Sequence, residues 1–539
     1  MSLPVPLTVS IADKHVTAAV SGLQFRKEAV GGVVSINLTL SAPLSSLAVT
    51  AFDKCKVMDG RTAEVIAEGR ISDPGRTAGT DGQRYSVAAL GPATHADDIY
   101  LPLIYVDQTV TDGWRQVDRT VKHASYSQST KPGSTSDTAP ECIVFQFPEG
   151  LTVATNDDVT ARYERIREAG MKVGLVAFDV DGGLNSVDYQ AKVFLRTDGA
   201  GGAAAYSANL STATSSQALV VVTDFTNGRN TIDLKLNYSG AGGTIPNDNR
   251  WLSFGNFIIR SMLLDATGAD ITTGYGLQYV TAARVVTDLL GRVLDQYDGA
   301  GASVDSTNTY QIDSLAYPDG VSPREVMADL MLFEPAFYWT TGPDVTGNGY
   351  QFWWKAWPTS VRYEATLEDG GDFPVSTTEL YNQVSVRWRD NRGRVRSTLR
   401  TGACPLLDDQ GLTRRAVLDV GDEIASYNGA VRVGDNFLAD HLYPANSGTL
   451  TIKRPIRDLM TGRMVAPHEI EPGELIRVRG VESYPDALNA SSNDGQTVFR
   501  IWAMTYTSDE NTSVLELDTY PRTTWAALAK LQTKRPRKR

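Results

Sequence analysis

The stretch KCKVMDGRTAEVIAEGRISDPG, residues 54–75, decides how the first part of the chain folds. Asp59-Gly60 divides it into two short runs rich in apolar residues, and Asp-Gly pairs favour tight hairpins because both residues tolerate a positive φ. The stretch therefore predicts two strands joined by a turn at Asp59. We expect the second strand to stop at Asp73-Pro74-Gly75, because proline has no N–H to donate to a ladder.

Three charged residues, Glu68, Arg70 and Asp73, lie near the end of this hairpin. Such a group suits the rim of a catalytic or sugar-binding site, and it equally suits a barrel strand that meets a copy of itself. Because Glu68 and Arg70 are two residues apart on a strand, their side chains share one face. We interpret them as cross-strand or inter-subunit ion-pairing residues at a subunit interface.

The length and amino-acid composition of the chain limit the possible fold classes. A chain of 539 residues with 42% apolar and 21% charged residues is of the globular type, and its length predicts about three to five domains. Its 47 glycines and 9% aromatic residues suit β structure with many turns. The net charge of −12 argues against a nucleic-acid groove as the main surface.

The sequence shows no membrane or secretion signal. No apolar run reaches the roughly 18 residues of a membrane-spanning helix, and the start MSLPVPLTVSIADKHV has no basic segment followed by an apolar one. We therefore expect the chain to be made and folded in a cytoplasm. The three cysteines, Cys55, Cys142 and Cys404, are far apart, which predicts buried thiols rather than disulfides or a zinc site.

The periodicity predicts a mainly β fold with an α+β middle. Val34, Ile36, Leu38 and Leu40 alternate with small or polar residues, as in half-buried strands. We expect two small β-barrel domains, an inserted jelly-roll-like β-sandwich of the carbohydrate-binding type, and two helices at 281–293 and 322–333. The expected divisions are a barrel at 1–115, a Ser/Thr/Pro-rich linker at 116–140, the sandwich at 141–270, the α+β domain at 271–376, a second barrel at 377–522 with a helical insertion at about 424–443, and a short helix with a basic tail at 523–539.

The second of these helices has the clearest start. Ser322, Pro323 and Glu325 fit the N-cap, the first-turn proline and the acid of a capping box. In the helix before it, Thr281 is the expected N-cap residue. At the other end of the chain, the tail KRPRKR could bind an acidic partner, although such an end is commonly solvated, and its role stays open.

The residue types that commonly serve in catalysis do not occur here in the spacings of known catalytic motifs. The five histidines form no HExxH or HxH pattern, and no GxSxG or GxxxxGK[ST] motif occurs. The acidic pairs Asp97-Asp98, Asp157-Asp158 and Asp408-Asp409 are adjacent in sequence, so their side chains point apart on a strand. We predict no catalytic residues, no cofactor and no enzymatic activity.

Two weaker ligand candidates lie in the predicted sandwich. Asp179, Asp181, Asn185 and Asp188 surround a Gly-Gly bend and offer oxygen atoms for a calcium ion, although their spacing does not match an EF-hand and an ordinary turn explains them as well. Trp251 opens a strand of the sandwich and is the candidate for stacking on a sugar ring.

Several stretches carry a family resemblance. They are VSGLQFRKEAVGG through EGRISDPG to ALGPATHADDIYLP, then YQIDSLAYPDGVSPREVMADLM, YNQVSVRWRDNRGR, EPGELIRVRG and FRIWAMTYTSDENTSVLELD. In this collinear order the chain resembles the hub proteins at the tail tip, or baseplate, of long-tailed bacteriophages, which are called minor tail proteins in phages of actinobacteria. The resemblance covers about 1–110 and 275–525 and leaves the insert outside it.

The resemblance implies a structural component of the virion tail tip, assembled in the cytoplasm of the bacterial host. In such hubs two β-barrels per subunit form a ring of three chains, which offers a sixfold-like surface to the tail tube and a threefold base to a central fibre. The implied partners also include a distal tail protein and the tape-measure protein, and DNA passes through the lumen without specific binding. The insert would face outward, toward host-surface polysaccharide or neighbouring tail proteins.

Two other functions remain open at this stage. One is a distal tail protein, which would form a ring of six chains and also carry a carbohydrate-binding module. The other is a carbohydrate-binding or glycan-degrading surface protein, against which the missing secretion signal and the lack of a converging acid pair both count.

Overall fold

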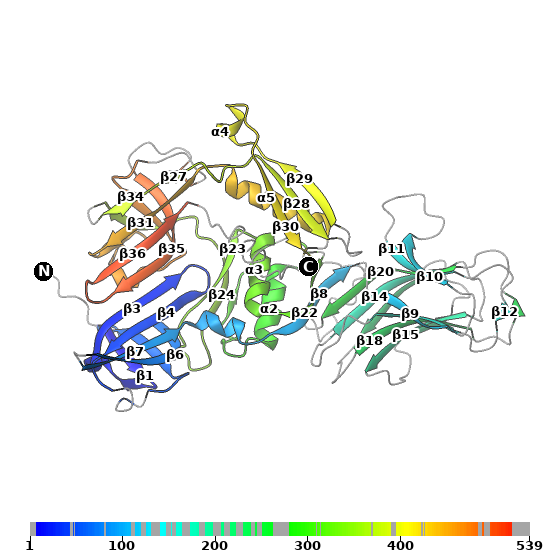
Figure 1. Ribbon diagram of the computed structural model, residues 1–539, viewed down its shortest axis with the longest axis horizontal. Coiled ribbons are helices and arrows are strands. Elements are labelled where there is room, and N and C mark those ends of the chain that lie inside the picture. The colour runs from blue at the N-terminus through cyan, green and yellow to red at the C-terminus, as the bar shows by residue number, and fades with distance from the viewer. Residues whose placement is uncertain are drawn as a thin grey trace.

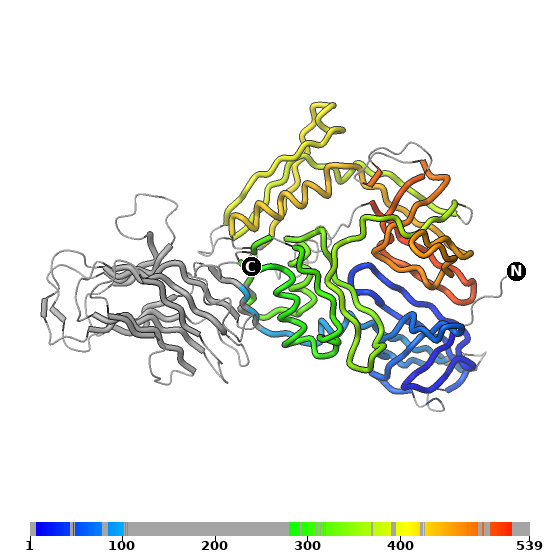
Figure 2. Tube along the Cα trace, turned by 180° about the vertical axis from the view of Figure 1, so that it is seen from behind, coloured from blue at the N-terminus to red at the C-terminus, as the bar shows by residue number. Residues whose placement is uncertain are grey.

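We describe the protein from a computed structural model. It describes residues 7–108 and 280–519, except 44–46, 48, 80–81, 309, 313, 368–369, 390–394, 422–423, 425, 483–487 and 490–495. Between residues 109 and 279 it describes only the backbone of individual strands. The mainly β fold with an α+β middle is confirmed, and the elements are arranged as in Figures 1 and 2.

The first β-domain is a meander followed by a short 3-10 helix, η2 (Pro92–Asp97). Its strands lie side by side in the order β2-β1-β5-β6-β7-β4-β3. Alternating residues of β3, and of β4 from Ile36 to Leu40, are buried, so the period-two pattern marks the core face there. At the start of β4, Val33 is buried and the predicted Val34 is not, because the ladder with β3 shifts its register between Val33 and Ser35. The strands are β1 (Leu7–Ile11), β2 (Lys14–His15), β3 (Val20–Glu28), β4 (Gly32–Leu40), β5 (Lys54–Asp59), β6 (Val65–Gly79) and β7 (Gly82–Leu90).

The hairpin predicted at Asp59 is confirmed, but the predicted end of its second strand is wrong. Strand β6 runs through Asp73-Pro74-Gly75 and pairs with β7 as far as Gly79. The reason lies in the other edge of β6, where the pairing with β5 ends at Arg70. Beyond that point β6 has a ladder only with β7, and the register shifts between Ile71 and Asp73. A proline is tolerated there because its missing N–H removes no ladder bond on the open edge.

The second β-domain takes its strands from two separate parts of the chain. One part lies before residue 377, since β25 pairs with β32 and, in parallel, with β34. The strands are β25 (Val361–Thr366), β26 (Gly371–Asp372), β27 (Val375–Ser376), β31 (Ala445–Ile452), β32 (Ile456–Asp458), β33 (Met464–Val465), β34 (Leu475–Arg479), β35 (Gln496–Thr507) and β36 (Thr512–Asp518), with the 3-10 helix η4 at Pro467–Glu469.

Strand β35 joins the two β-domains into one sheet of sixteen strands. Its first part pairs with β34 from Gln496 to Arg500, and its second part pairs with β3 from Ala503 to Thr507. Its other edge pairs with β36. The buried side chains of both β-domains form one hydrophobic cluster, in which Phe25 on β3 contacts Tyr506 on β35 with ring centroids 5.2 Å apart.

A helical unit lies between the β-domains and the rest of the chain (Figure 1). It holds helices α2 (Ala282–Arg292) and α3 (Pro323–Phe333) and a small sheet of β21 (Ser303–Val304), β23 (Phe337–Thr341) and β24 (Phe352–Ala356). The capping box at Ser322 is confirmed, with Glu325 N donating to Ser322 Oγ and Ser322 N donating to Glu325 Oε2. Thr281 occupies the N-cap position of α2 without a side-chain hydrogen bond. Instead the Asn308 amide lies 3.2 Å from Ala282 N, and caps α2 when its oxygen faces that atom.

A further α+β unit separates β27 from β31. Strands β28 (Gln383–Arg389), β29 (Val395–Thr401) and β30 (Arg415–Gly421) form its sheet. One face of this sheet packs against helix α5 (Tyr427–His441), which lies in the region where the sequence predicts a helical insertion, and the short helix α4 (Pro405–Asp408) follows β29. Buried side chains of this unit and of the helical unit form one cluster.

Among the described strands, residues 101–261 supply two larger antiparallel sheets, the strand pattern that a sandwich predicts, and the two-stranded sheet β12-β19. The first has β10-β11-β20-β14-β17, and β20 also pairs with β8 (Leu101–Gln108), which pairs with β22 (Ser314–Val321). The second has β16-β15-β18-β13-β9. The bounds are β9 (Trp114–Arg119), β10 (Ser125–Thr130), β11 (Glu141–Gln146), β12 (Thr152–Val153), β13 (Asp158–Tyr163), β14 (Val173–Gly182), β15 (Tyr189–Thr197), β16 (Tyr206–Asn209), β17 (Ser216–Val221), β18 (Asn230–Tyr238), β19 (Gly243–Thr244) and β20 (Trp251–Ser261).

Within the described residues, no helix combines the length and the apolar character needed to cross a lipid bilayer.

A substitution at Gly32 tests how the first β-domain is attached to strand β23. Its φ is +83°, and a Cβ there would collide with the backbone oxygen of Thr341 on β23. We expect Gly32→Ala to destabilise the protein by about 2–4 kcal/mol, because alanine is strained at that φ and β23 must move away. Chemical denaturation of the purified variant measures the loss.

Gly291 is the matched control. It lies on α2, and no described atom apart from its chain neighbours and its own helix backbone comes within 4 Å of the place that an added methyl group would take, so Gly291→Ala should stabilise the protein by about 0.5–1 kcal/mol. Equal effects of the two substitutions would contradict the role given to Gly32.

Candidate functional site

Three parts of the chain meet at the turn between β3 and β4. Gly31 N donates to Trp339 O on β23 at 3.0 Å, and Thr341 Oγ1 donates to Gly31 O at 2.6 Å. On the other side, Ala29 N donates to Trp502 O on β35 at 2.8 Å. The turn therefore ties the first β-domain both to the helical unit and to the second β-domain.

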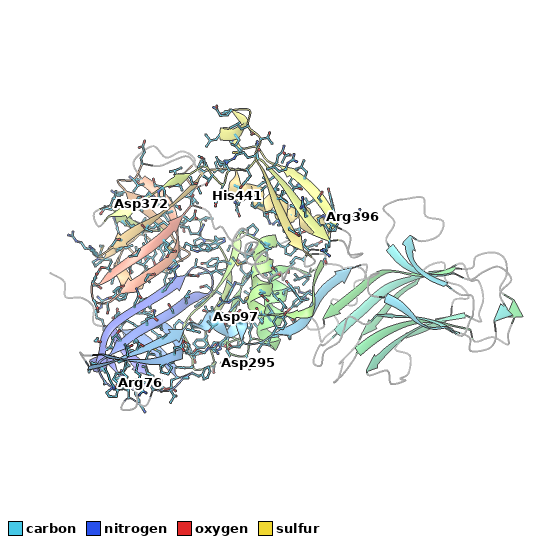
Figure 3. All side chains as sticks on the ribbon, viewed as in Figure 1. Arg76, Asp97, Asp295, Asp372, Arg396 and His441 are labelled. Carbon is cyan, nitrogen blue, oxygen red and sulfur yellow. The ribbon has the colours of Figure 1, made fainter. Side chains whose placement is uncertain are left out.

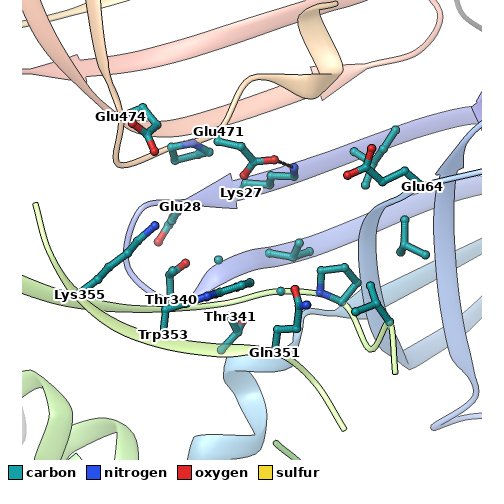
Figure 4. A pocket seen from close by; sticks show the side chains of 18 of the residues that line it. Lys27, Glu28, Glu64, Thr340, Thr341, Gln351, Trp353, Lys355, Glu471 and Glu474 are labelled. Carbon is teal, nitrogen blue, oxygen red and sulfur yellow. Dashed lines mark hydrogen bonds and ion pairs between the residues drawn. The ribbon is translucent and has the colours of Figure 1, made fainter. Parts of the chain in front are cut away.

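A cleft of about 400 Å³ opens beside this meeting point (Figure 4). It is the candidate binding site of the described residues, because it receives side chains from all three parts. The labelled side chains around it are Lys27, Glu28, Glu64, Thr340, Thr341, Gln351, Trp353, Lys355, Glu471 and Glu474.

Most charges of the cleft are already paired. Lys27 Nζ lies 2.7 Å from Glu471 Oε1, which ties β3 to the segment before β34. Arg362 on β25 lies 3.3 Å from Glu474. Glu28 accepts a hydrogen bond from Arg26, whose guanidinium also binds Glu516 on β36 across β35. The cleft is thus lined by groups that hold the two β-domains together, and nothing in this pairing supplies an activated nucleophile.

Glu68 lies inside the chain. Its side chain is fully buried, and Oε2 accepts a hydrogen bond from Asp344 N at 2.8 Å. Lys54 and Lys56 each place Nζ 3.9 Å from Oε1. Burial raises the pKa of Glu68, and the Asp344 amide and the two lysines oppose that shift. Every one of these contacts joins β6 to its own chain, so Glu68 fastens the loop after β23 to the first β-domain.

Arg70 also pairs within the chain, with Asp98 at the end of η2. Its guanidinium makes a two-pronged ion pair, with Arg70 Nη1 donating to Asp98 Oδ2 at 2.6 Å. This hydrogen bond lowers the pKa of Asp98. Arg70 remains partly exposed, and its place at a subunit interface stays a prediction.

The acidic pairs of the sequence have structural partners where the structure describes them. Asp97 binds Arg324 of α3 at 2.9 Å, while Asp98 binds Arg70 (Figure 3 labels Asp97). Asp408 accepts hydrogen bonds from Cys404 N and from the Asn382 amide. The side chains of Asp157-Asp158 lie outside the described residues. Asp97, Asp98 and Asp408 therefore each have a structural partner within the chain.

One turn occurs twice, once in each β-domain. Asp59 Oδ1 accepts from the backbone N–H groups of Arg61 and Thr62, and Asp458 Oδ1 accepts from those of Met460 and Thr461. In both turns the threonine Oγ1 then accepts from the N–H two residues on, and the next residue after the threonine has a positive φ. We call this the Asp-Thr turn.

The strands around the two Asp-Thr turns also correspond. The first joins β5 to β6 and the second joins β32 to β33. Asp59 pairs antiparallel with Leu7 of β1, and Asp458 pairs antiparallel with Tyr363 of β25. The two β-domains therefore contain the same three-strand unit, β1-β5-β6 and β25-β32-β33.

Among the described residues, one group has the spacing of metal ligands: Asp59, His468 and Glu469, whose ligand atoms all lie within 4.8 Å of one another. Burial of His468 lowers the pKa of its ring. Burial alone would raise the pKa of Asp59, but the hydrogen bonds from Arg61 and Thr62 outweigh it and lower that pKa.

The sequence candidates in the sandwich cannot be placed against these sites. Asp179 and Asp181 lie on β14 and Trp251 begins β20, but their side chains are outside the described residues, as are Asn185 and Asp188 altogether. The group at Asp59 is not predictable from the sequence because its members are about 410 residues apart. The Asp-Thr turn does have a visible signal, the Asp-x-x-Thr spacing shared by 59–62 and 458–461.

No protein-family model matches the chain, and comparison with curated proteins also finds no match. The chain is similar to the solved structure of the 43 kDa tail protein of prophage MuSo2 from Shewanella oneidensis, at 9% identity and a TM-score of 0.42, over 95% of this chain and 97% of that one. It is similar to a tail protein from Neisseria meningitidis MC58 at 8% identity and a TM-score of 0.43, over 98% and 99%.

A third similarity is partial. It is to the K1 cleaved adhesin domain of Lys-gingipain from Porphyromonas gingivalis W83, at 12% identity and a TM-score of 0.23, over 31% of this chain and 99% of that domain. These TM-scores are too low to establish a common fold. The function is therefore inferred from this chain's own residues.

The buried histidines predict a stability loss on acidification. Burial lowers the pKa of His468 and, together with nearby Arg70, that of His95. Below the ordinary histidine pKa of about 6.5 the unfolded chain therefore binds more protons than the folded chain. We expect the free energy of unfolding to be full above that pH and to fall between pH 6.5 and 5, by at most about 1.4 kcal/mol per pH unit for each histidine.

Denaturant unfolding at fixed pH, in the presence of a chelator, measures this loss. The variants His95→Gln and His468→Gln should each flatten the curve relative to the parent chain, which separates the histidines from Glu68, whose raised pKa acts with the opposite sign. An unchanged pH dependence in both variants would show that neither histidine is responsible.

Proposed function

We propose that the chain is a non-enzymatic structural subunit of the tail tip of a long-tailed phage, and that it forms a hub ring of three chains. The collinear sequence resemblance over about 1–110 and 275–525 supports this proposal. The two β-domains with their repeated three-strand unit support it independently.

The repeated unit is the observation that carries the proposal. A closed ring needs surfaces that recur at regular angles. Because each chain holds β1-β5-β6 and β25-β32-β33, three chains supply six related units. Such a ring offers six similar positions to a sixfold tail tube and keeps threefold symmetry toward a central fibre.

The joint between the β-domains suits a rigid ring subunit. The β3–β35 ladder, the Arg26–Glu516 ion pair and the shared hydrophobic cluster fix the two β-domains against each other in one sheet. A subunit with a fixed angle between its two contact units closes a ring of one size, because each interface repeats the same geometry.

The proposed position of the ring at the tail tip implies which virion proteins it contacts. The tail tube and a distal tail protein would lie on one side and the central fibre on the other, with the tape-measure protein in the lumen. The net charge of −12 suits a channel through which DNA moves without binding. The ring would be assembled in the bacterial cytoplasm and remain in the virion, and its second β-domain would begin at β25 rather than at the expected residue 377.

The outward module would be the sandwich of residues 141–270. Glycan contact through Trp251 and calcium binding by Asp179, Asp181, Asn185 and Asp188 remain part of this proposal as additions to its role. Their test is a glycan array and a calcium titration with the full chain.

The mass of the assembled ring tests the oligomeric state. We expect native mass spectrometry of the full chain to give three times the 58.5 kDa subunit mass. A mass of six subunits would favour the distal tail protein instead. Cross-linking in intact particles should place the chain beside tail-tube and fibre proteins, whereas absence from particles or turnover of a polysaccharide would refute the structural role.

Substitutions at Arg70 test the predicted subunit interface. Because Arg70 also binds Asp98 of its own chain, the single change Arg70→Glu would disturb the fold as well as a neighbour contact. The double change Arg70→Glu with Asp98→Arg restores an internal ion pair with its charges exchanged. If Arg70 contacts a neighbouring subunit, we expect both variants to assemble poorly in native mass spectrometry.

The double variant shows whether Arg70 contacts a neighbouring subunit or only its own chain. Full recovery of the ring together with full thermal stability would mean that Arg70 acts only inside its own chain.

A further inference from the structure

His468 is a buried histidine whose ring nitrogens lack hydrogen bonds. Its side chain is fully buried in η4, and among the described residues neither Nδ1 nor Nε2 has a hydrogen-bond partner. Buried polar atoms in folded proteins nearly always have a partner, and a ring without one requires an explanation. The ring does face a charged group, since Nε2 lies 3.5 Å from Asp59 Oδ2.

The positions of the neighbouring carboxylates fit a metal ion. Ligand bonds of about 2.0–2.1 Å at a tetrahedral ion place two ligand atoms roughly 3.3 Å apart, close to the separation of His468 Nε2 and Asp59 Oδ2. Glu469 brings a third ligand atom within 4.8 Å of the other two. The three side chains come from both β-domains, Asp59 from the end of β5 and the other two from η4.

Both carboxylates are held in place by backbone amides. Asp59 Oδ1 accepts from Arg61 N at 2.6 Å within its Asp-Thr turn, which leaves Oδ2 directed at the histidine. Glu469 Oε2 accepts from Ala466 N at 2.6 Å, which leaves Oε1 free of that bond. Hydrogen bonds of this kind orient metal ligands and are a regular part of metal sites.

Arg61 supplies the positive charge at this place in the structure. Its Nη2 lies 3.2 Å from Asp59 Oδ2 and 3.6 Å from Glu469 Oε1. The guanidinium balances the carboxylates, but it leaves both nitrogens of His468 without a hydrogen bond. Because the Arg61 side chain is 54% exposed, it can turn into solvent without disturbing the core.

We propose that Asp59, His468 and Glu469 bind a divalent transition-metal ion, zinc by preference, with Arg61 displaced into solvent. Imidazole with carboxylate oxygens is a ligand set that zinc accepts readily. The ion would clamp the first β-domain to the second beside the β3–β35 ladder, since the His468 ring centroid lies 5.5 Å from that of Tyr506 on β35. This inference does not depend on the proposed function, because it concerns only how the two β-domains are held.

Zinc binding to the full chain tests the proposal. The protein is stripped with a chelator, transferred to chelator-free buffer and titrated with zinc chloride by calorimetry. We expect one ion per chain, a higher Tm with zinc, and with cobalt the visible absorption of a tetrahedral site. His468→Gln and Glu469→Gln should each weaken binding by on the order of tenfold or more, whereas Arg61→Ala should tighten it several-fold because the competing cation is gone.

Control variants ensure that each result either supports or contradicts the proposed zinc site. His15 is exposed on β2, and His15→Gln should leave zinc binding unchanged. Failure to bind one zinc ion, or binding that neither His468→Gln nor Glu469→Gln weakens, would overturn the proposal. If His468→Gln fails to fold, Arg61→Ala decides, since its exposed side chain is dispensable for the core: tighter zinc binding supports the site and unchanged binding contradicts it.

Discussion

The antiparallel ladder between β3 and β35 is the constraint on which the rest of the structure depends. It makes one sheet from strands at opposite ends of the chain, and β35 serves both β-domains because its two parts pair with different neighbours on the same edge. Two charged residues within the ladder, Arg26 and Lys27, pair with acids of the second β-domain. The cleft, the buried Glu68 and the turn at Gly31 all lie where this joined sheet meets the helical unit.

The two β-domains are related by a local unit and not by their whole strand order. The Asp-Thr turn and the strand that pairs with its aspartate recur, while the connections between the other strands differ. In the proposed ring, the shared unit would give each chain two similar surfaces, and the differing connections would let each domain meet a different neighbour. Such a combination would suit a subunit that stands between parts of different symmetry.

Local features were predictable from the sequence and long-range ones were not. Ser322 with Glu325 marked a helix start, and Asp59-Gly60 marked a hairpin, because capping and turn formation depend on a few neighbouring residues. The strand end predicted at Pro74 was wrong, because the effect of a proline depends on whether its strand has a neighbour on each edge. Which edges of β6 are paired is a property of the whole sheet. The pairing of β3 with β35 and the meeting of Asp59 with His468 join residues more than 400 positions apart, for which a single sequence carries no periodic signal.

The sharing of β35 also has a consequence for how the chain is made. Strand β3 is synthesised early, but Ala503, its ladder partner at Glu28, follows about 475 residues later. At a synthesis rate of about 5–20 residues per second, the ribosome needs roughly 25 to 95 s to deliver it. Throughout that interval the nascent first β-domain presents an unpaired strand edge, which is a template for pairing with other chains. Production of this protein in the cell therefore depends on protecting that edge until translation is nearly finished.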